Sequence, residues 1–142
     1  MNDALLSTGK DDWETPHEFF EKLNKEFCFT LDPCSNGANR KCDKYYTEEQ
    51  DGLNQDWSGE TVFCNPPYSQ RKPGQKEWIK KCYTESQKPG TKVVMLIPAR
   101  TDTAAFHDYI YGKAEIRFVR GRLKFVGAEY NAPFPCMVVV FG

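Results

Sequence analysis

The chain has 142 residues, a formal net charge of −1, and apolar and aromatic contents of 39% and 14%. This length suits one domain with a single continuous core, and the composition excludes a disordered or low-complexity protein. Since the chain carries no global basic charge, any contact with a nucleic acid has to come from local basic clusters.

Two further classes of protein are excluded by residue usage. No apolar run approaches the roughly 20 residues that span a membrane, and no secretory signal opens the chain, so we expect a cytoplasmic protein without a membrane partner. The two histidines are far apart and no C-x-x-C pair is present, so we expect no metal site. The six cysteines are expected to be reduced and mostly structural, with three in strand-like runs: Cys28, Cys64 and Cys136.

The first part of the chain predicts a flexible segment, a helix and a strand. Residues 1–12 are polar and are expected to be flexible, whereas residues 13–142 form the domain. Thr15 suits a helix N-cap, Pro16 the first helical position, and Glu18 completes a capping box. Aromatic and aliphatic residues then recur at helical spacing. The alternating run at 27–32 predicts a strand that ends at Asp32 and Pro33.

Residues 34–60 form a long polar stretch rich in Asn, Gly and Asp, which predicts a loop. The run TVFC at 61–64 predicts a strand, and residues 76–87 predict a helix with one apolar face. A continuous apolar run at 92–98 is typical of a strand that is covered on both faces. Residues 101–112 predict a short helix stopped by Gly112.

The tail from residue 113 is strand-rich, and VRGR at 119–122 predicts a hairpin. Strands that alternate with helices and end in an antiparallel hairpin indicate an α/β three-layer sandwich in one minimal domain. We therefore expect ligands at the carboxyl ends of the strands, as in other open α/β sheets.

The motif Asn65-Pro66-Pro67-Tyr68 follows the predicted strand TVFC directly. Each proline fixes its own φ and restricts the residue before it, so Asn65 and Tyr68 are held stiffly. The exocyclic amine of adenine is a poor nucleophile because its lone pair is delocalised into the ring. The Asn65 side-chain oxygen and the Pro66 carbonyl could accept its two N–H groups and favour the attacking geometry. Tyr68 could stack on a base flipped out of a duplex.

NPPY after a strand resembles the catalytic motif of amino-group methyltransferases that use S-adenosylmethionine. The order of DDWETPHEFF, FTLDPC, DGLNQDW, VFCNPPY, VVMLIPAR and GRLKF…APFPCMVVVF is similar to that of the phage DNA N6-adenine methyltransferase family, the phage Dam type. The resemblance covers the chain from about residue 11 onward. It implies a Rossmann-like fold, S-adenosylmethionine as cofactor, and site-specific methylation of adenine N6 in the DNA of a bacterial or phage-infected cell.

The resemblance also implies the residues that hold the methyl donor. Thr15 and Pro16 would lie near its carboxylate, and Asp32 with Pro33 near its amino group. The donor's adenine amine would contact Asp56, with Trp57 beside it, and Asp51 competes for that pocket or for the ribose. Asn65 would border both donor and base. The usual Gly-rich loop is missing and LDPCSNGANR stands in its place. Either the loop at 34–60 supplies the donor contacts differently, or Thr15 and Asp32 contribute more of them.

The predicted DNA contacts are basic residues near the same sheet edge. They are Arg100 after the strand at 92–98, and Arg71, Lys72, Arg120, Arg122 and Lys124 in the loops at 69–76 and 113–131. The alternative for the last three is a solvated strand face. No room remains for a separate target-recognition domain, so these loops have to position the DNA, and a homodimer would enlarge their footprint.

Two alternatives stay open, and a third is rejected. Phe125 could help form a pocket for the flipped base or belong to the core. Cys136 could belong to a Pro-Cys nucleophile loop of the kind that cytosine C5 methylation needs, but it opens an apolar strand and is interpreted as core. The enzyme could act on RNA or on a protein glutamine, or the chain could be a silent nucleic-acid-binding or antirestriction protein that keeps the fold.

Overall fold

The structure is a computed structural model that describes residues 13–69 and 73–142. The predicted N-terminal segment 1–12 and the predicted DNA contacts Arg71 and Lys72 lie outside the described residues.

One mixed sheet of six strands forms the centre of the fold, in the order β3-β2-β4-β5-β7-β6. The strands β3, β2, β4 and β5 are parallel, β7 runs antiparallel to β5, and β6 runs antiparallel to β7. All residues of β5 except the first are buried, as the apolar run at 92–98 predicts. Every residue of β7 is buried as well. The bounds are β2 Leu31–Asp32, β3 Lys44–Tyr45, β4 Thr61–Cys64, β5 Lys92–Pro98, β6 Glu115–Phe118 and β7 Cys136–Phe141.

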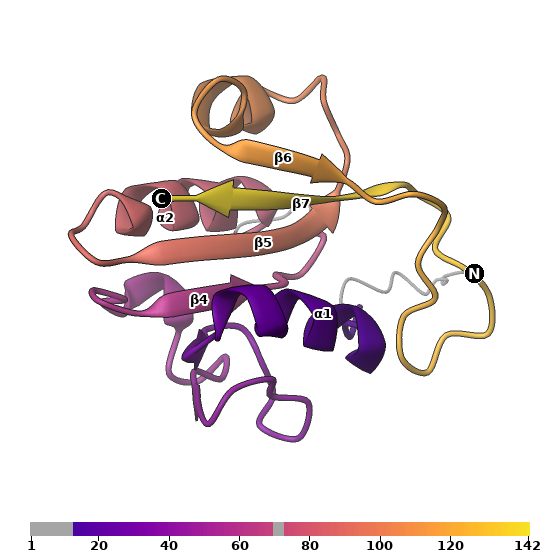
Figure 1. The fold of residues 1–142 in the computed structure, drawn as a ribbon, viewed down its shortest axis with the longest axis horizontal. Coiled ribbons are helices and arrows are strands. Elements are labelled where there is room, and N and C mark those ends of the chain that lie inside the picture. The colour runs from indigo at the N-terminus through magenta and orange to yellow at the C-terminus, as the bar shows by residue number, and fades with distance from the viewer. Residues whose placement is uncertain (1–12, 70–72) are drawn as a thin grey trace.

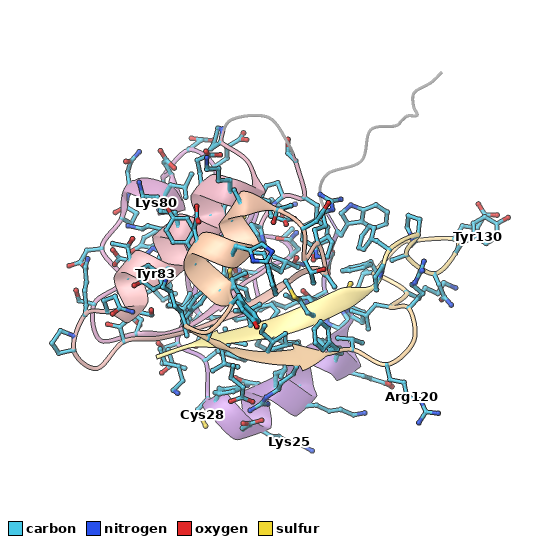
Figure 2. The ribbon with its side chains drawn as sticks, turned by 90° about the horizontal axis from the view of Figure 1, so that it is seen from above. Lys25, Cys28, Lys80, Tyr83, Arg120 and Tyr130 are labelled. Carbon is cyan, nitrogen blue, oxygen red and sulfur yellow. The ribbon has the colours of Figure 1, made fainter. Side chains whose placement is uncertain are left out.

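Helices cover both faces of this sheet. The helix α1 (His17–Phe27) lies over one face, and α2 (Gln75–Ser86) lies over the other, as both views show (Figures 1 and 2). Helix α2 turns Trp78, Ile79 and Cys82 toward the sheet, because apolar residues recur there at helical spacing. A short 3₁₀ helix, η1 (Gly52–Asn54), and a π-helical segment, η2 (Phe106–Ile110), complete the described elements. The mixed α/β architecture is therefore confirmed.

The start of α1 differs from the prediction by one residue, and the difference matters for the site. Pro16 occupies the N-cap and no side chain from the described part of the chain caps the helix, so the predicted capping box of Thr15 and Glu18 is wrong. The Thr15 hydroxyl instead accepts a hydrogen bond from Asn65, 50 positions along the chain. The local sequence predicts that this hydroxyl caps the helix, but it is hydrogen-bonded to a residue that is distant in sequence.

The predicted strand at 27–32 is also shorter than expected. Helix α1 runs through Phe27, and Cys28 adopts a left-handed conformation (φ 56°) as its C-cap, where its N–H donates to the Asn24 carbonyl at 2.8 Å. The Asn24 side chain accepts from the Phe29 N–H, also at 2.8 Å. Cys28 is thus an exposed cap residue and not part of a buried strand.

The tail forms the predicted antiparallel pair without the predicted tight turn. Phe118 ends β6 opposite Met137 of β7, so residues 119–135 form a long connecting loop. Two residues of this loop, Phe125 and Ala132, are buried, so this part of the loop packs against the domain. The pair β6–β7 is confirmed, whereas the hairpin at VRGR is wrong, because core packing spreads the connection.

The topology brings three chain segments to one edge of the sheet. Strands β2, β4 and β5 are parallel, and the chain leaves their carboxyl ends at Pro33, Asn65 and Ala99. Open α/β sheets bind ligands at this edge. This edge is therefore the expected position of the site.

Candidate active site

The Asn65 side chain links the end of β4 to the segment that precedes α1. Its Nδ2 atom donates to the Trp13 carbonyl at 2.5 Å and to the Thr15 hydroxyl at 2.9 Å. Its Oδ1 atom accepts from the Tyr68 hydroxyl at 2.5 Å. Because a backbone carbonyl can only accept, the Trp13 contact fixes which end of the amide faces the segment. Among the described residues Tyr68 is the one donor to Oδ1, so one lone pair of this oxygen remains for a further donor.

Tyr68 supports Asn65 from within the core. The residue is only 6% exposed, and its ring packs edge-on against Phe125 and Phe134 at centroid distances of 6.2 and 5.6 Å. Its hydroxyl also lies 3.0 Å from the Leu96 carbonyl, and burial raises the pKa of this phenol well above its usual value. A buried ring offers almost no face to a base, so the predicted stacking role of Tyr68 does not fit this structure.

A cavity of about 410 Å³ opens beside this amide. Of the predicted site residues, five line it: Thr15, Pro33, Asn65, Pro66 and Pro67. The loop that follows β2 forms much of the opposite wall, through residues that include Cys34, Ser35, Asn36 and Asn39. The stretch that begins at residue 34 thus lines the cavity, and its contacts with the donor stay a prediction.

Three charged residues that line the cavity were missed by sequence reasoning. Glu14 precedes α1, Lys41 lies in the loop after β2, and Glu48 follows β3. The Lys41 side chain is 8% exposed, and its ammonium group lies 3.7 Å from the Glu14 carboxylate. None of the three belongs to a motif, and only their position in polar stretches next to predicted strands could have pointed to them.

Asp32 lies behind the cavity wall and does not line the cavity. Its carboxylate accepts the backbone N–H groups of Cys34 at 3.2 Å and Lys41 at 2.9 Å. Burial raises the pKa of this carboxyl, although the two N–H groups act in the opposite direction. The carboxylate therefore shapes the loop that forms the wall, and the direct donor contact implied for Asp32 stays a prediction.

Asp56 also does not line the cavity. It is exposed and accepts hydrogen bonds from the Ser58 N–H at 3.0 Å and from Lys88 Nζ at 2.9 Å. The Ser58 hydroxyl, which donates to the same carboxylate at 2.5 Å, and these two bonds hold the pKa of the Asp56 carboxyl well below its usual range. Because Asp56 precedes β4, it lies toward the amino end of the strand and does not line the cavity, and its contact with the donor's adenine stays a prediction.

Three of the predicted donor-binding residues do not line the cavity: Trp57, Asp51 and Pro16. Trp57 is fully buried, and its indole Nε1–H donates to the Gly52 carbonyl at 3.1 Å. Asp51 (φ 54°) caps η1 by accepting the Leu53 N–H at 3.3 Å. Gly52 itself lines the cavity, so both side chains position the wall, whereas Pro16 is the N-cap of α1.

The described basic residues predicted to contact DNA fall into two groups. Arg100 follows β5 and is half-buried, and its Nη1 atom is buried without a hydrogen-bond partner in the described part of the chain. Arg120, Arg122 and Lys124 are exposed on the loop 119–135, where Arg122 also contacts the Ala132 carbonyl at 3.5 Å. Phe125 lies next to Lys124 in sequence and is 1% exposed, so it belongs to the core.

The cysteines offer no activated nucleophile at the buried positions. All six are free thiols. Cys136 is 1% exposed, and burial raises its thiol pKa to about 11, in agreement with its interpretation as core. Burial likewise raises the pKa of Cys64 at the end of β4. A thiolate at Cys136 is therefore disfavoured at neutral pH.

Two further features are absent from residues 13–69 and 73–142. No three His, Cys, Asp or Glu side chains of this part come together as metal ligands do. No helix in the same residues has the length and apolarity to cross a membrane.

Comparison with known proteins gives two kinds of similarity. The family described as DNA N-6-adenine-methyltransferase (Dam) matches residues 3–138. A protein of Haemophilus phage HP1 named DNA N-6-adenine-methyltransferase is 31% identical over 123 residues, which cover 84% of this chain and 69% of that protein. A protein of the same name from Escherichia phage T1 is 30% identical over 116 residues, which cover 80% of this chain and 47% of that protein. The chain thus spans about half the T1 protein, and it belongs to the DNA N-6-adenine-methyltransferase (Dam) family.

Proposed function

We propose that this chain transfers a methyl group from S-adenosylmethionine to N6 of adenine in DNA. Its family and both phage relatives support DNA adenine-N6 methylation. The observation that carries the proposal is the Asn65 amide, fixed by Trp13, Thr15 and Tyr68 at the border of the cavity, with one acceptor position left. The parallel strands and the antiparallel β7 suit a Rossmann-like methyltransferase.

The cavity suits the methyl donor in size and charge. Its volume of about 410 Å³ lies within the usual range for small-molecule sites. The donor has one carboxylate, one ammonium and one sulfonium, so its net charge is positive. The three charged residues on the wall, Glu14, Lys41 and Glu48, sum to a negative charge. We assign Lys41 to the carboxylate and Glu48 to the ribose hydroxyls, because a carboxylate can accept both.

The reaction requires that the amine nitrogen direct its lone pair at the methyl carbon. When bound, S-adenosylmethionine supplies an electrophilic methyl group, and the C–S bond breaks as the N–C bond forms. The Asn65 Oδ1 atom and the Pro66 carbonyl accept the two N–H groups and hold the amine in the attacking geometry. No donor from the described part of the chain contacts the Pro66 carbonyl. The proton released from N6 passes to solvent.

The target base needs a face to stack on once it is flipped out of the duplex. The aromatic cluster beside Asn65 has two half-buried rings, Trp13 and Phe134, whose centroids lie 5.2 Å apart. Trp13 also lines the cavity. We therefore assign base stacking to Trp13 and Phe134, and we assign to Tyr68 the support of the Asn65 amide.

The test is transfer of labelled methyl groups to duplex DNA, RNA and protein, followed by nucleoside and amino-acid analysis. We expect N6-methyladenine in DNA, and label in no other product. Label in RNA or in protein glutamine would keep the chemistry and replace the substrate. Absence of both transfer and donor binding, measured by calorimetry, would favour a silent nucleic-acid-binding protein.

The exposed basic residues of the loop 119–135 are proposed to contact DNA phosphates. Replacing Arg122 and Lys124 together with alanine should weaken DNA binding and lower the slope of log K against log salt by about 1 to 2, because each phosphate contact contributes about 0.9. Fluorescence anisotropy at several salt concentrations measures this slope. The charge-matched control replaces Lys25 on α1 and Lys80 on α2, which lie on the helix-covered faces (Figure 2).

The control should keep the wild-type slope, and an unchanged slope in the Arg122 and Lys124 variant would mean that the loop is only a solvated surface. Arg100 and the loop at 69–76 are further proposed contacts, and a homodimer would join two such surfaces. Sedimentation of the protein with and without DNA tests that last proposal.

A further inference from the structure

The loop 119–135 extends past the sheet at the edge that carries Asn65. It leaves β6 after Phe118 and enters β7 at Cys136, which lies opposite Pro98 at the carboxyl end of β5. Figure 1 shows the loop projecting beyond the ends of the strands. The loop is therefore on the same side of the molecule as the cavity.

The base of the loop is fixed to the site by specific contacts. The Val126 N–H donates to the Glu14 carbonyl at 3.0 Å, and Val126 and Glu14 both line the cavity. The buried ring of Phe125 packs against Tyr68, and the Ala132 N–H closes the loop onto the Leu123 carbonyl at 2.7 Å. The position of the loop relative to Asn65 is thus set by packing, as an element that acts on the substrate requires.

The tip of the loop presents an aromatic side chain to solvent. Tyr130 is 75% exposed, and it makes no hydrogen bond or ring contact within residues 13–69 and 73–142. Figure 2 shows its side chain at the far end of the loop, away from the body of the domain, with Arg120 near the loop's other arm. The loop has three basic residues and one acidic residue, Glu129, which favours an anionic partner.

We propose that Tyr130 inserts into the stack of the DNA duplex beside the target adenine and fills the space that the flipped base leaves. The inference rests on the proposed function, since it requires a base to be extruded. An inserted side chain offsets the lost stacking, and an aromatic ring is suited to this because it stacks on any base. The basic residues Arg120 and Lys124 then contact the phosphates on either side.

The test compares Tyr130→Ala with wild type on two duplexes built around a sequence that the wild type methylates. In one duplex the target adenine is paired with thymine, and in the other it lies opposite an abasic site. We expect the variant to methylate the paired target about 5- to 150-fold more slowly, as the loss of one aromatic stack implies. For the target opposite the abasic site, the methylation rate of the variant should fall by less than about threefold, because an unpaired base is easier to extrude.

Two variants serve as controls. Tyr130→Phe keeps the ring and should keep the wild-type rate on both duplexes. Tyr111→Ala removes another exposed tyrosine, 66% exposed, which precedes β6 at the amino end of β5, opposite the cavity. It should also methylate both duplexes at the wild-type rate, and thermal unfolding of each variant reports folding separately.

The inference is overturned if Tyr130→Ala methylates the paired target at the wild-type rate. It is also overturned if the variant slows equally on both duplexes, because the ring then acts on something other than base extrusion. A wild-type protein that binds the donor but methylates no DNA would contradict the proposed function itself, and the inference with it.

Discussion

The variant Asn65→Ala is expected to transfer methyl groups at least about 100-fold more slowly than wild type at saturating donor and DNA, because it lacks a fixed acceptor for the reacting amine. Donor affinity should fall by about tenfold at most. That smaller effect arises because the Asn65 amide also anchors Trp13 and Thr15, which line the cavity, and a hydrogen bond contributes only about 0.5–1.5 kcal/mol net. Single-turnover kinetics and calorimetry separate the two quantities.

The matched control for this variant is Asn54→Ala. Asn54 is an exposed amide that does not line the cavity, and within residues 13–69 and 73–142 its side chain hydrogen-bonds to Asp51 alone, so its loss should leave the transfer rate unchanged. A folded Asn65→Ala protein with the wild-type transfer rate would remove Asn65 from the mechanism. Loss of cooperative unfolding in Asn65→Ala would mean that the main role of the amide is to stabilise the fold.

Replacing Gly52 with alanine should reduce both stability and donor binding. A Cβ atom at this position would lie 2.2 Å from the Pro33 carbonyl oxygen, and both residues line the cavity. Such overpacking costs about 1–3 kcal/mol of unfolding free energy. Because the wall has to move to relieve the clash, we expect donor affinity to fall about tenfold or more, which corresponds to about 1.4 kcal/mol of lost contacts.

Chemical denaturation and donor titration measure these two effects, and Gly112→Ala serves as the control. Gly112 has a positive φ of 76°, and an added Cβ there would meet no atom within 4 Å, so alanine strains the backbone without touching the cavity. That control should lose stability but keep the wild-type donor affinity. Equal donor affinities for Gly52→Ala and wild type would show that the wall at Pro33 does not contact the donor.

Elements with strong local signals were predicted well from the sequence. The apolar run of β5 and the apolar face of α2 are encoded by neighbouring residues, and so is the stop that the prolines impose after Asn65. Parallel pairing of β4 with β5 then brings Asn65 to the expected sheet edge. The motif and the edge of the site therefore follow from short-range patterns.

The residues behind the motif could not be predicted in the same way. Asp32 was expected to bind the donor, but its carboxylate is taken by the N–H groups of Cys34 and Lys41. Thr15 was expected to cap a helix, but its hydroxyl is taken by Asn65. Each of these partners is set by how distant segments fold back, and single-sequence patterns do not contain that information.

The paired acceptors around Tyr68 have a consequence for substrate entry. The phenol has one proton, and it can give that proton either to Asn65 Oδ1 at 2.5 Å or to the Leu96 carbonyl at 3.0 Å. An arriving amine that takes a lone pair of Oδ1 can therefore turn the phenol toward Leu96 without leaving a buried hydroxyl unsatisfied. Rotation about one C–O bond lets the site exchange an internal hydrogen bond for one to the substrate, and the desolvation penalty of an orphaned hydroxyl is avoided.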